Sequence, residues 1–136
     1  MNRVVLDTNV FLSAFIYGGM SEQIFDLIVD EKLTLFVSPP LVTEIIRKFK
    51  EKGASKEMIQ NIISLLKLRA TLVTPKIKIN ICRDPADNFL FELAQTSSTD
   101  YLITRDNDLL DLKVWKKSRI ITPEIFFSIL RKKKQI

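Results

Sequence analysis

The stretch Val4-Val5-Leu6-Asp7-Thr8-Asn9-Val10 decides the fold of this chain, because an unbroken apolar run ends in a carboxylate and a second apolar stretch follows at once. A short, continuous apolar run is typical of a strand that a parallel sheet buries on both faces. In open α/β sheets, the residues just after the carboxyl ends of such strands line the ligand crevice. Asp7 is therefore the first candidate functional residue.

Further apolar runs repeat this pattern and predict an α/β fold, with a central parallel sheet flanked by helices. They occupy residues 33–37, 71–73, 101–103 and 119–121. Between the runs, apolar residues at helical spacing predict helices that are capped by Ser21, opened by Pro39-Pro40, capped by Ser55, preceded by Asp87 and opened by Pro123. We expect one doubly wound domain over residues 1–136.

Composition excludes several kinds of active site. The chain has one cysteine and no histidine, which rules out a Ser-His-Asp triad, a histidine base and the usual nitrogen or thiolate zinc sites. The single Cys82 agrees with a reducing compartment. The first apolar run is too short for a secretory leader or a membrane span. We therefore expect a cytoplasmic protein with no membrane contact.

Positive charge points to a polyanionic partner. The formal net charge is +5, and basic residues gather at 47–52, 113–117 and 131–134. Such clusters favour a phosphate backbone. On charge alone, a lysine-rich solvated surface is an equally good interpretation.

Three more acids, Glu44, Asp87 and Asp106, lie near predicted strand ends. Because the carboxyl ends of parallel strands meet at one edge of a sheet, these acids and Asp7 can converge on one cleft. Two carboxylates about 5 Å apart repel by roughly 3 kcal/mol at an effective dielectric of 20, and a bound divalent ion removes this cost. With oxygen ligands alone, Mg²⁺ or Mn²⁺ is favoured over Zn²⁺.

Each acid also has an ordinary structural explanation. Asp7 and Asp87 can cap helices. Glu44 can pair with the lysine four residues on, and Asp106 and Asp108 can satisfy backbone groups in a turn. Four separate explanations are then needed, whereas their common location at strand ends has a single explanation in a shared site.

The order and spacing of these segments resemble the PIN-domain nucleases over nearly the whole chain. The segments are residues 4–12, Glu44, Asp84-Pro85-Ala86-Asp87-Asn88 and residues 102–110. Residues 121–126 resemble the end of one bacterial and archaeal (VapC-like) branch of toxins from toxin-antitoxin pairs.

The resemblance implies an endoribonuclease that binds Mg²⁺ or Mn²⁺ in an acidic pocket, cuts RNA with a metal-activated water and is paired with an antitoxin. The acidic set of the family falls on Asp7, Glu44, Asp87 and Asp106, its hydroxyl position on Thr8 or Thr104, and supporting positions on Asn9, Asp84 and Asp108.

Two other functions remain open. An aspartate-nucleophile phosphatase is weakened because the second acid of such enzymes, two residues on, is Asn9 here. A non-catalytic basic module could bind nucleic acid or a partner. The exposed part of the apolar helices between residues 40 and 68, with Phe126 and Phe127, is expected to supply a surface for a homodimer or an inhibitory protein.

Overall fold

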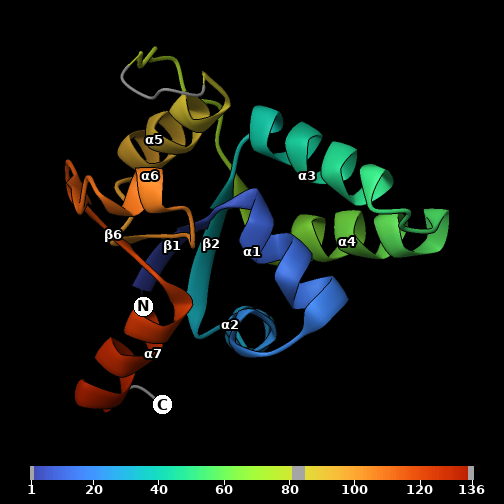
Figure 1. Cartoon of the computed structure of the whole chain (residues 1–136), viewed down its shortest axis with the longest axis horizontal. Coiled ribbons are helices and arrows are strands. Elements are labelled where there is room, and N and C mark those ends of the chain that lie inside the picture. The colour runs from blue at the N-terminus through green and yellow to red at the C-terminus, as the bar shows by residue number, and fades with distance from the viewer. Residues whose placement is uncertain (1, 81–84, 135–136) are drawn as a thin grey trace.

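The apolar runs form a six-stranded sheet of order β3-β2-β1-β4-β6-β5 in the computed structural model, which describes residues 2–80 and 85–134 (Figure 1). The strands are β1 (Asn2–Leu6), β2 (Leu33–Val37), β3 (Ala70–Leu72), β4 (Tyr101–Ile103), β5 (Val114–Trp115) and β6 (Ser118–Ile121). Every neighbouring pair of these strands is parallel except β5 with β6. The predicted α/β fold with a central parallel sheet is confirmed.

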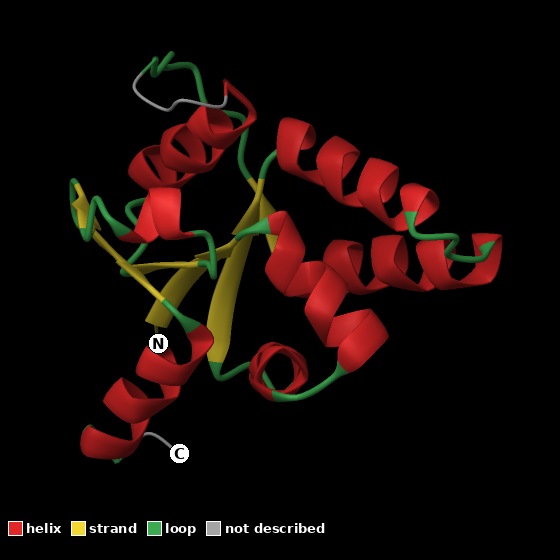
Figure 2. Ribbon diagram, viewed as in Figure 1, coloured by secondary structure: helices red, strands yellow, loops and turns green. Residues whose placement is uncertain are grey.

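Helices cover both faces of this sheet. They are α1 (Thr8–Leu12), the π-helical turn η1 (Ser13–Tyr17), α2 (Met20–Val29), α3 (Pro39–Glu51), α4 (Lys56–Arg69), α5 (Pro85–Ser97), α6 (Asn107–Leu110) and α7 (Pro123–Lys132). In Figure 2, α5 lies on one side of the strands and α2 and α7 on the other, and the α3–α4 pair projects beyond the sheet. Among the described residues, no helix has the length and apolar character needed to span a membrane.

The core explains why β1 and β4 carry continuous apolar runs. These two strands are central, and residues such as Val5 and Leu102 have no exposed surface. Between α1, η1, α2 and α3, the rings of Phe11, Phe15, Phe25 and Phe49 meet edge to face at centroid distances of 5.0 to 5.9 Å. Continuous apolar strands are therefore required by helices packed on both faces.

The expectation that Phe126 and Phe127 supply a partner surface is wrong. Phe126 is 0% and Phe127 4% exposed, and the Phe126 ring lies 5.5 Å from that of Tyr101. Helix α7 packs beside α2 and turns both phenylalanines into the core. The exposed large apolar side chains instead include Leu68 in α4 and Leu72 in β3, with Ile125 in α7.

Two helix starts differ from the predicted ones. Helix α2 begins at Met20 after Gly19, whose φ of 74° favours glycine, so Ser21 is buried inside the helix rather than capping it. Helix α5 begins at Pro85, so Asp87 lies in its first turn and is not its cap.

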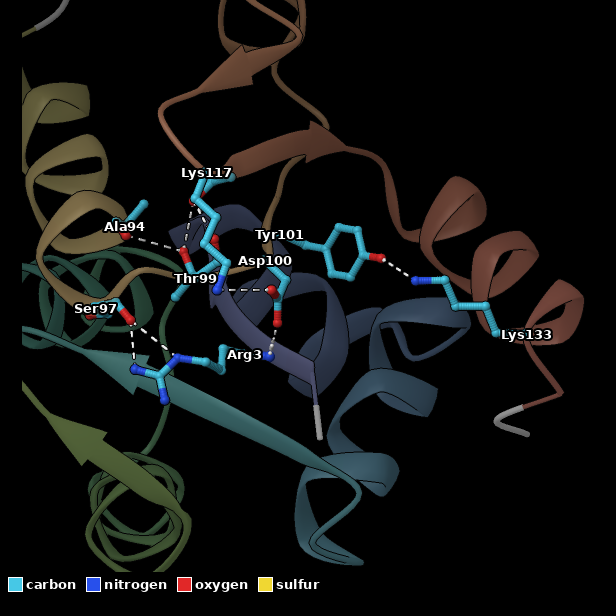
Figure 3. A network of polar contacts seen from close by, with 9 residues as sticks. Arg3, Ala94, Ser97, Thr99, Asp100, Tyr101, Lys117 and Lys133 are labelled. Atoms are coloured by element: carbon cyan, nitrogen blue, oxygen red, sulfur yellow. Dashed lines mark hydrogen bonds and ion pairs between the residues drawn. The ribbon is translucent and has the colours of Figure 1, made fainter.

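A network of polar contacts fastens the amino ends of β1 and β4 (Figure 3). The backbone N–H of Arg3 donates to Asp100 Oδ2 at 2.9 Å, and the Arg3 guanidinium donates to the carbonyl oxygen of Ser97, at the end of α5, at 2.6 and 3.2 Å. The same guanidinium stacks 4.4 Å from the centroid of the Phe36 ring. These contacts stabilise the amino edge of the sheet, which is the edge opposite the one where the predicted acids lie.

Candidate active site

The carboxyl edge of the sheet holds a small polar cavity of about 110 Å³. Its lining residues are Asp7, Thr8, Asn9, Glu44, Lys48, Asp87, Phe89, Leu90 and Asp106. All four acids predicted from the sequence thus meet in one cavity, although they come from four separate segments of the chain. The convergence follows from the topology, because β1 lies between β2 and β4.

Asp7 is the most buried of these acids, with 7% of its surface exposed. It follows β1 and caps α1, where its Oδ1 accepts the N–H of Asn9 at 3.4 Å. Its Oδ2 accepts the hydroxyl of Thr104 at 2.7 Å. Burial raises the pKa of Asp7, and the negative charge of Asp106 adds to this rise. Asp7 thus caps α1, as its ordinary structural explanation predicts, and it is also a buried carboxylate in an acidic cavity.

Thr104 and Asp106 extend this arrangement along the loop after β4. The Thr104 hydroxyl accepts the N–H of Asp106 at 3.0 Å, and Asp106 Oδ1 accepts the N–H of Asp108 at 2.9 Å. Asp106 therefore caps α6 and also lines the cavity. Asp108, predicted to support the site, is exposed and is not among the lining residues. Thr104 is fully buried behind Asp7.

Glu44 reaches the cavity from α3 and carries two cationic neighbours. Arg47 donates to Oε1 at 2.7 Å and to Oε2 at 3.1 Å, and Lys48 Nζ lies 3.8 Å from Oε1. The predicted pair with Lys48 is present, but Arg47 is closer. Glu44 is 17% exposed and so is largely shielded from water.

Asp87 enters the cavity from the first turn of α5. A negative charge is favourable there, because the first backbone N–H groups of a helix are unpaired and the helix dipole is positive at that end. Thr8 is buried and Asn9 exposed, and both line the cavity. Asp84 and Cys82 lie outside the described residues.

Lys48 is a cavity residue that the sequence reasoning treated only as an ion-pair partner of Glu44. Residues four apart project from the same side of a helix, so this spacing could have placed Lys48 in the site as well. Phe89 and Leu90 complete the wall with apolar surface. Their position two and three residues after Asp87 is the signal that could have identified them.

The donor atoms of this cavity fit a hydrated Mg²⁺ or Mn²⁺. Within residues 2–80 and 85–134, no three His, Cys, Asp or Glu side chains are grouped closely enough to hold an ion among them. Mg²⁺ usually keeps several water ligands and takes only one or two protein carboxylates. A buried carboxylate whose pKa is raised by burial and by a neighbouring acid is the kind of oxygen ligand that such a cation stabilises.

Comparison with known proteins adds a family and a fold. The sequence model of a family described as PIN domain matches residues 3–108, a range that contains all four acids. An uncharacterized protein of Methanocaldococcus jannaschii is 33% identical over 117 residues, covering 82% of this chain and 75% of the relative. One chain in the crystal structure of VapBC2 from Rickettsia felis, solved with a DNA fragment from the VapBC2 promoter, has the same fold. It superposes with a TM-score of 0.62 over 88% of this chain and 98% of that chain, at 14% identity.

Proposed function

The chain belongs to the PIN domain family of nucleases, and from this we propose that it is an endoribonuclease that depends on Mg²⁺ or Mn²⁺. One observation carries the proposal: Asp7, Glu44, Asp87 and Asp106 line a single cavity at the carboxyl edge of the sheet. Neither charge nor capping requires acids from four segments to meet there.

Asp7, Asp87 and Asp106, with Glu44, are the residues that would hold the ion, one or two of them directly and the others through its water ligands. When bound, the ion supplies a Lewis acid that activates a water for in-line attack on phosphorus and stabilises charge on the phosphate oxygens. The reaction adds water across a P–O bond of the RNA backbone and needs no protein nucleophile.

The protein itself fixes its carboxylates before substrate arrives. Asp7 is held by the Thr104 hydroxyl and the Asn9 N–H, and Asp106 by the Asp108 N–H. Oriented groups of this kind need not reorganise during the reaction, which is a main source of catalytic power.

The phosphatase alternative is disfavoured by the residue two positions after Asp7. The second acid that such enzymes carry at this position is Asn9 here, and Asn9 lines the cavity beside Asp7. The non-catalytic alternative is left to experiment.

We further propose that the protein is the toxin of a toxin-antitoxin pair and acts in the cytoplasm. The support is the VapC-like ending at residues 121–126 and the fold shared with VapBC2. An antitoxin partner and a homodimer both remain predictions. Surface for either is available on the α3–α4 arm, where Leu68 is 75% exposed.

The test is cleavage of single-stranded and structured RNA by the purified protein, with Mn²⁺, with Mg²⁺ and with excess EDTA. We expect cleavage that requires the metal and that falls by at least about 100-fold in Asp7→Asn. Asp26→Asn is the matched control, because Asp26 is an exposed helical aspartate that does not line the cavity. Cleavage that persists in EDTA, or that is equal in Asp7→Asn and wild type, would contradict the proposal.

A further inference from the structure

Lys48 is a cation inside an acidic cavity. It lies in α3 one turn after Glu44, and its side chain is 32% exposed. It lines the cavity with Asp7, Asp87 and Asp106. Lys48 is therefore the one basic side chain among the described residues that line this cavity.

Glu44 does not need Lys48 as its partner. Arg47 already contacts both Glu44 oxygens, at 2.7 and 3.1 Å, whereas Lys48 Nζ is 3.8 Å from the nearer one. Two-point contact from a planar guanidinium is the stronger arrangement. Lys48 could therefore exchange its weak contact for another anion without leaving Glu44 unpaired.

The proposed substrate needs such a cation. Each RNA phosphate is negative, and a cavity lined by four carboxylates repels it. A lysine ammonium is a compact charge with three donors on a flexible stem, which suits a phosphate that must be met at varied angles.

We propose that Lys48 binds the phosphate that is cut, with its ammonium donating to a non-bridging oxygen, and this rests on the proposed nuclease function. The role makes Lys48 a fifth functional residue of the cavity. Because both are positive, Lys48 and a metal ion in this cavity repel each other, and each weakens the attraction of the four acids for the other.

Two effects of opposite sign follow for Lys48→Met. Without the lysine charge, Mn²⁺ should bind metal-free protein roughly 3- to 10-fold more tightly, the size expected when one neighbouring positive charge is removed in a water-like dielectric. Cleavage at saturating Mn²⁺ should fall roughly 100-fold, as when one donor to a developing charge is removed. Lys48→Arg keeps the charge and should retain most of the activity.

The experiment compares Lys48→Met with Lys32→Met, which removes the same charge from an exposed position at the amino edge of β2. Calorimetric titration with Mn²⁺, cleavage kinetics and thermal unfolding are measured on each. We expect Lys32→Met to match wild type within about twofold in Mn²⁺ affinity and in cleavage rate, and to unfold at the same temperature. Equal cleavage by Lys48→Met and wild type overturns the proposal, as does weaker Mn²⁺ binding with a lowered melting temperature, which would make Lys48 a structural partner of Glu44.

A wild type that cuts no RNA would refute the proposed nuclease function but still leave Lys48 open to test. Binding of a single-stranded RNA oligonucleotide to metal-free protein then decides. Weaker binding by Lys48→Met than by Lys32→Met supports the phosphate contact, and equal binding by the two variants excludes it.

Discussion

Thr104 and Asp7 are 97 residues apart in the chain, and the hydroxyl of Thr104 donates a 2.7 Å hydrogen bond to Oδ2 of Asp7. The two residues follow β4 and β1, which are paired in parallel up to Leu6 and Ile103. The same hydroxyl accepts the N–H of Asp106 at 3.0 Å. One buried hydroxyl therefore holds the carboxylate of Asp7 and the backbone of Asp106.

Thr104→Val should lower the free energy of unfolding by about 1 to 3 kcal/mol. Valine has nearly the same shape, but it leaves Asp7 Oδ2 and the Asp106 N–H without the Thr104 hydroxyl that now pairs with both. Denaturant unfolding measures the change. Thr104→Ser keeps the hydroxyl, loses only the methyl group and should be destabilised less. A loss in Thr104→Val no larger than that in Thr104→Ser would show that the two hydrogen bonds of the hydroxyl contribute little.

Asp7 should make the metal-free protein less stable as pH rises. Burial holds the pKa of Asp7 above its unfolded value, so between those two values the folded state keeps a proton that the unfolded state has released. The free energy of unfolding should fall across that window, starting near pH 4, and then level off. Asp7→Asn removes this contribution and should be more stable than wild type at neutral pH, while asparagine still caps α1. If the free energies of unfolding of the two proteins change with pH in parallel, the pKa of Asp7 is not raised in the folded state.

Asp87→Asn tests whether Asp87 is a metal ligand or only stabilises the first turn of α5 by its negative charge. Asp87 is in the first turn of α5, where loss of its charge should cost no more than about 1 kcal/mol. Metal-dependent cleavage should nevertheless fall by at least about 100-fold. Undiminished Mn²⁺-dependent cleavage at an unaltered melting temperature would return Asp87 to a structural role.

Arg3→Met should destabilise the fold without touching the chemistry. The change removes the guanidinium contacts to the Ser97 carbonyl and to the Phe36 ring, worth together about 1 to 3 kcal/mol. The affinity for Mn²⁺ should stay within about twofold of wild type, because Arg3 lies at the opposite edge of the sheet. A large loss of Mn²⁺ affinity in a folded Arg3→Met protein would mean that the two edges are coupled.

The sheet and the location of the acids could be predicted from sequence because both depend on local patterns. Continuous apolar runs mark strands buried on both faces, and a carboxylate just after such a run can lie only at the carboxyl edge. The convergence of Glu44 with Asp7 needed one further rule, that parallel strands end on the same side.

The errors have physical causes in tertiary packing. Phe126 and Phe127 form an apolar pair whose helical spacing is the same whether it faces the core or a partner, and only the position of α7 beside α2 decides. The β5–β6 hairpin was read only as a basic cluster, because its turn places Lys116 at a φ of 53° where a glycine would normally mark the bend. The spacing from Glu44 places Lys48 on the same side of α3, but whether this side faces the cavity depends on how α3 is rotated about its axis, which spacing alone does not fix.

The placement of β1 between β2 and β4 has a consequence for synthesis. A nascent chain that ends before Tyr101 already contains Asp7, Glu44 and Asp87, but it lacks β4, Thr104 and Asp106. Loop closure across nearly a hundred residues must come before the last carboxylate takes its place, and contacts of such long range form late in folding. The acidic centre is therefore completed only after most of the polypeptide has left the ribosome, so a truncated translation product would carry three of the four acids without β4, Thr104 or Asp106.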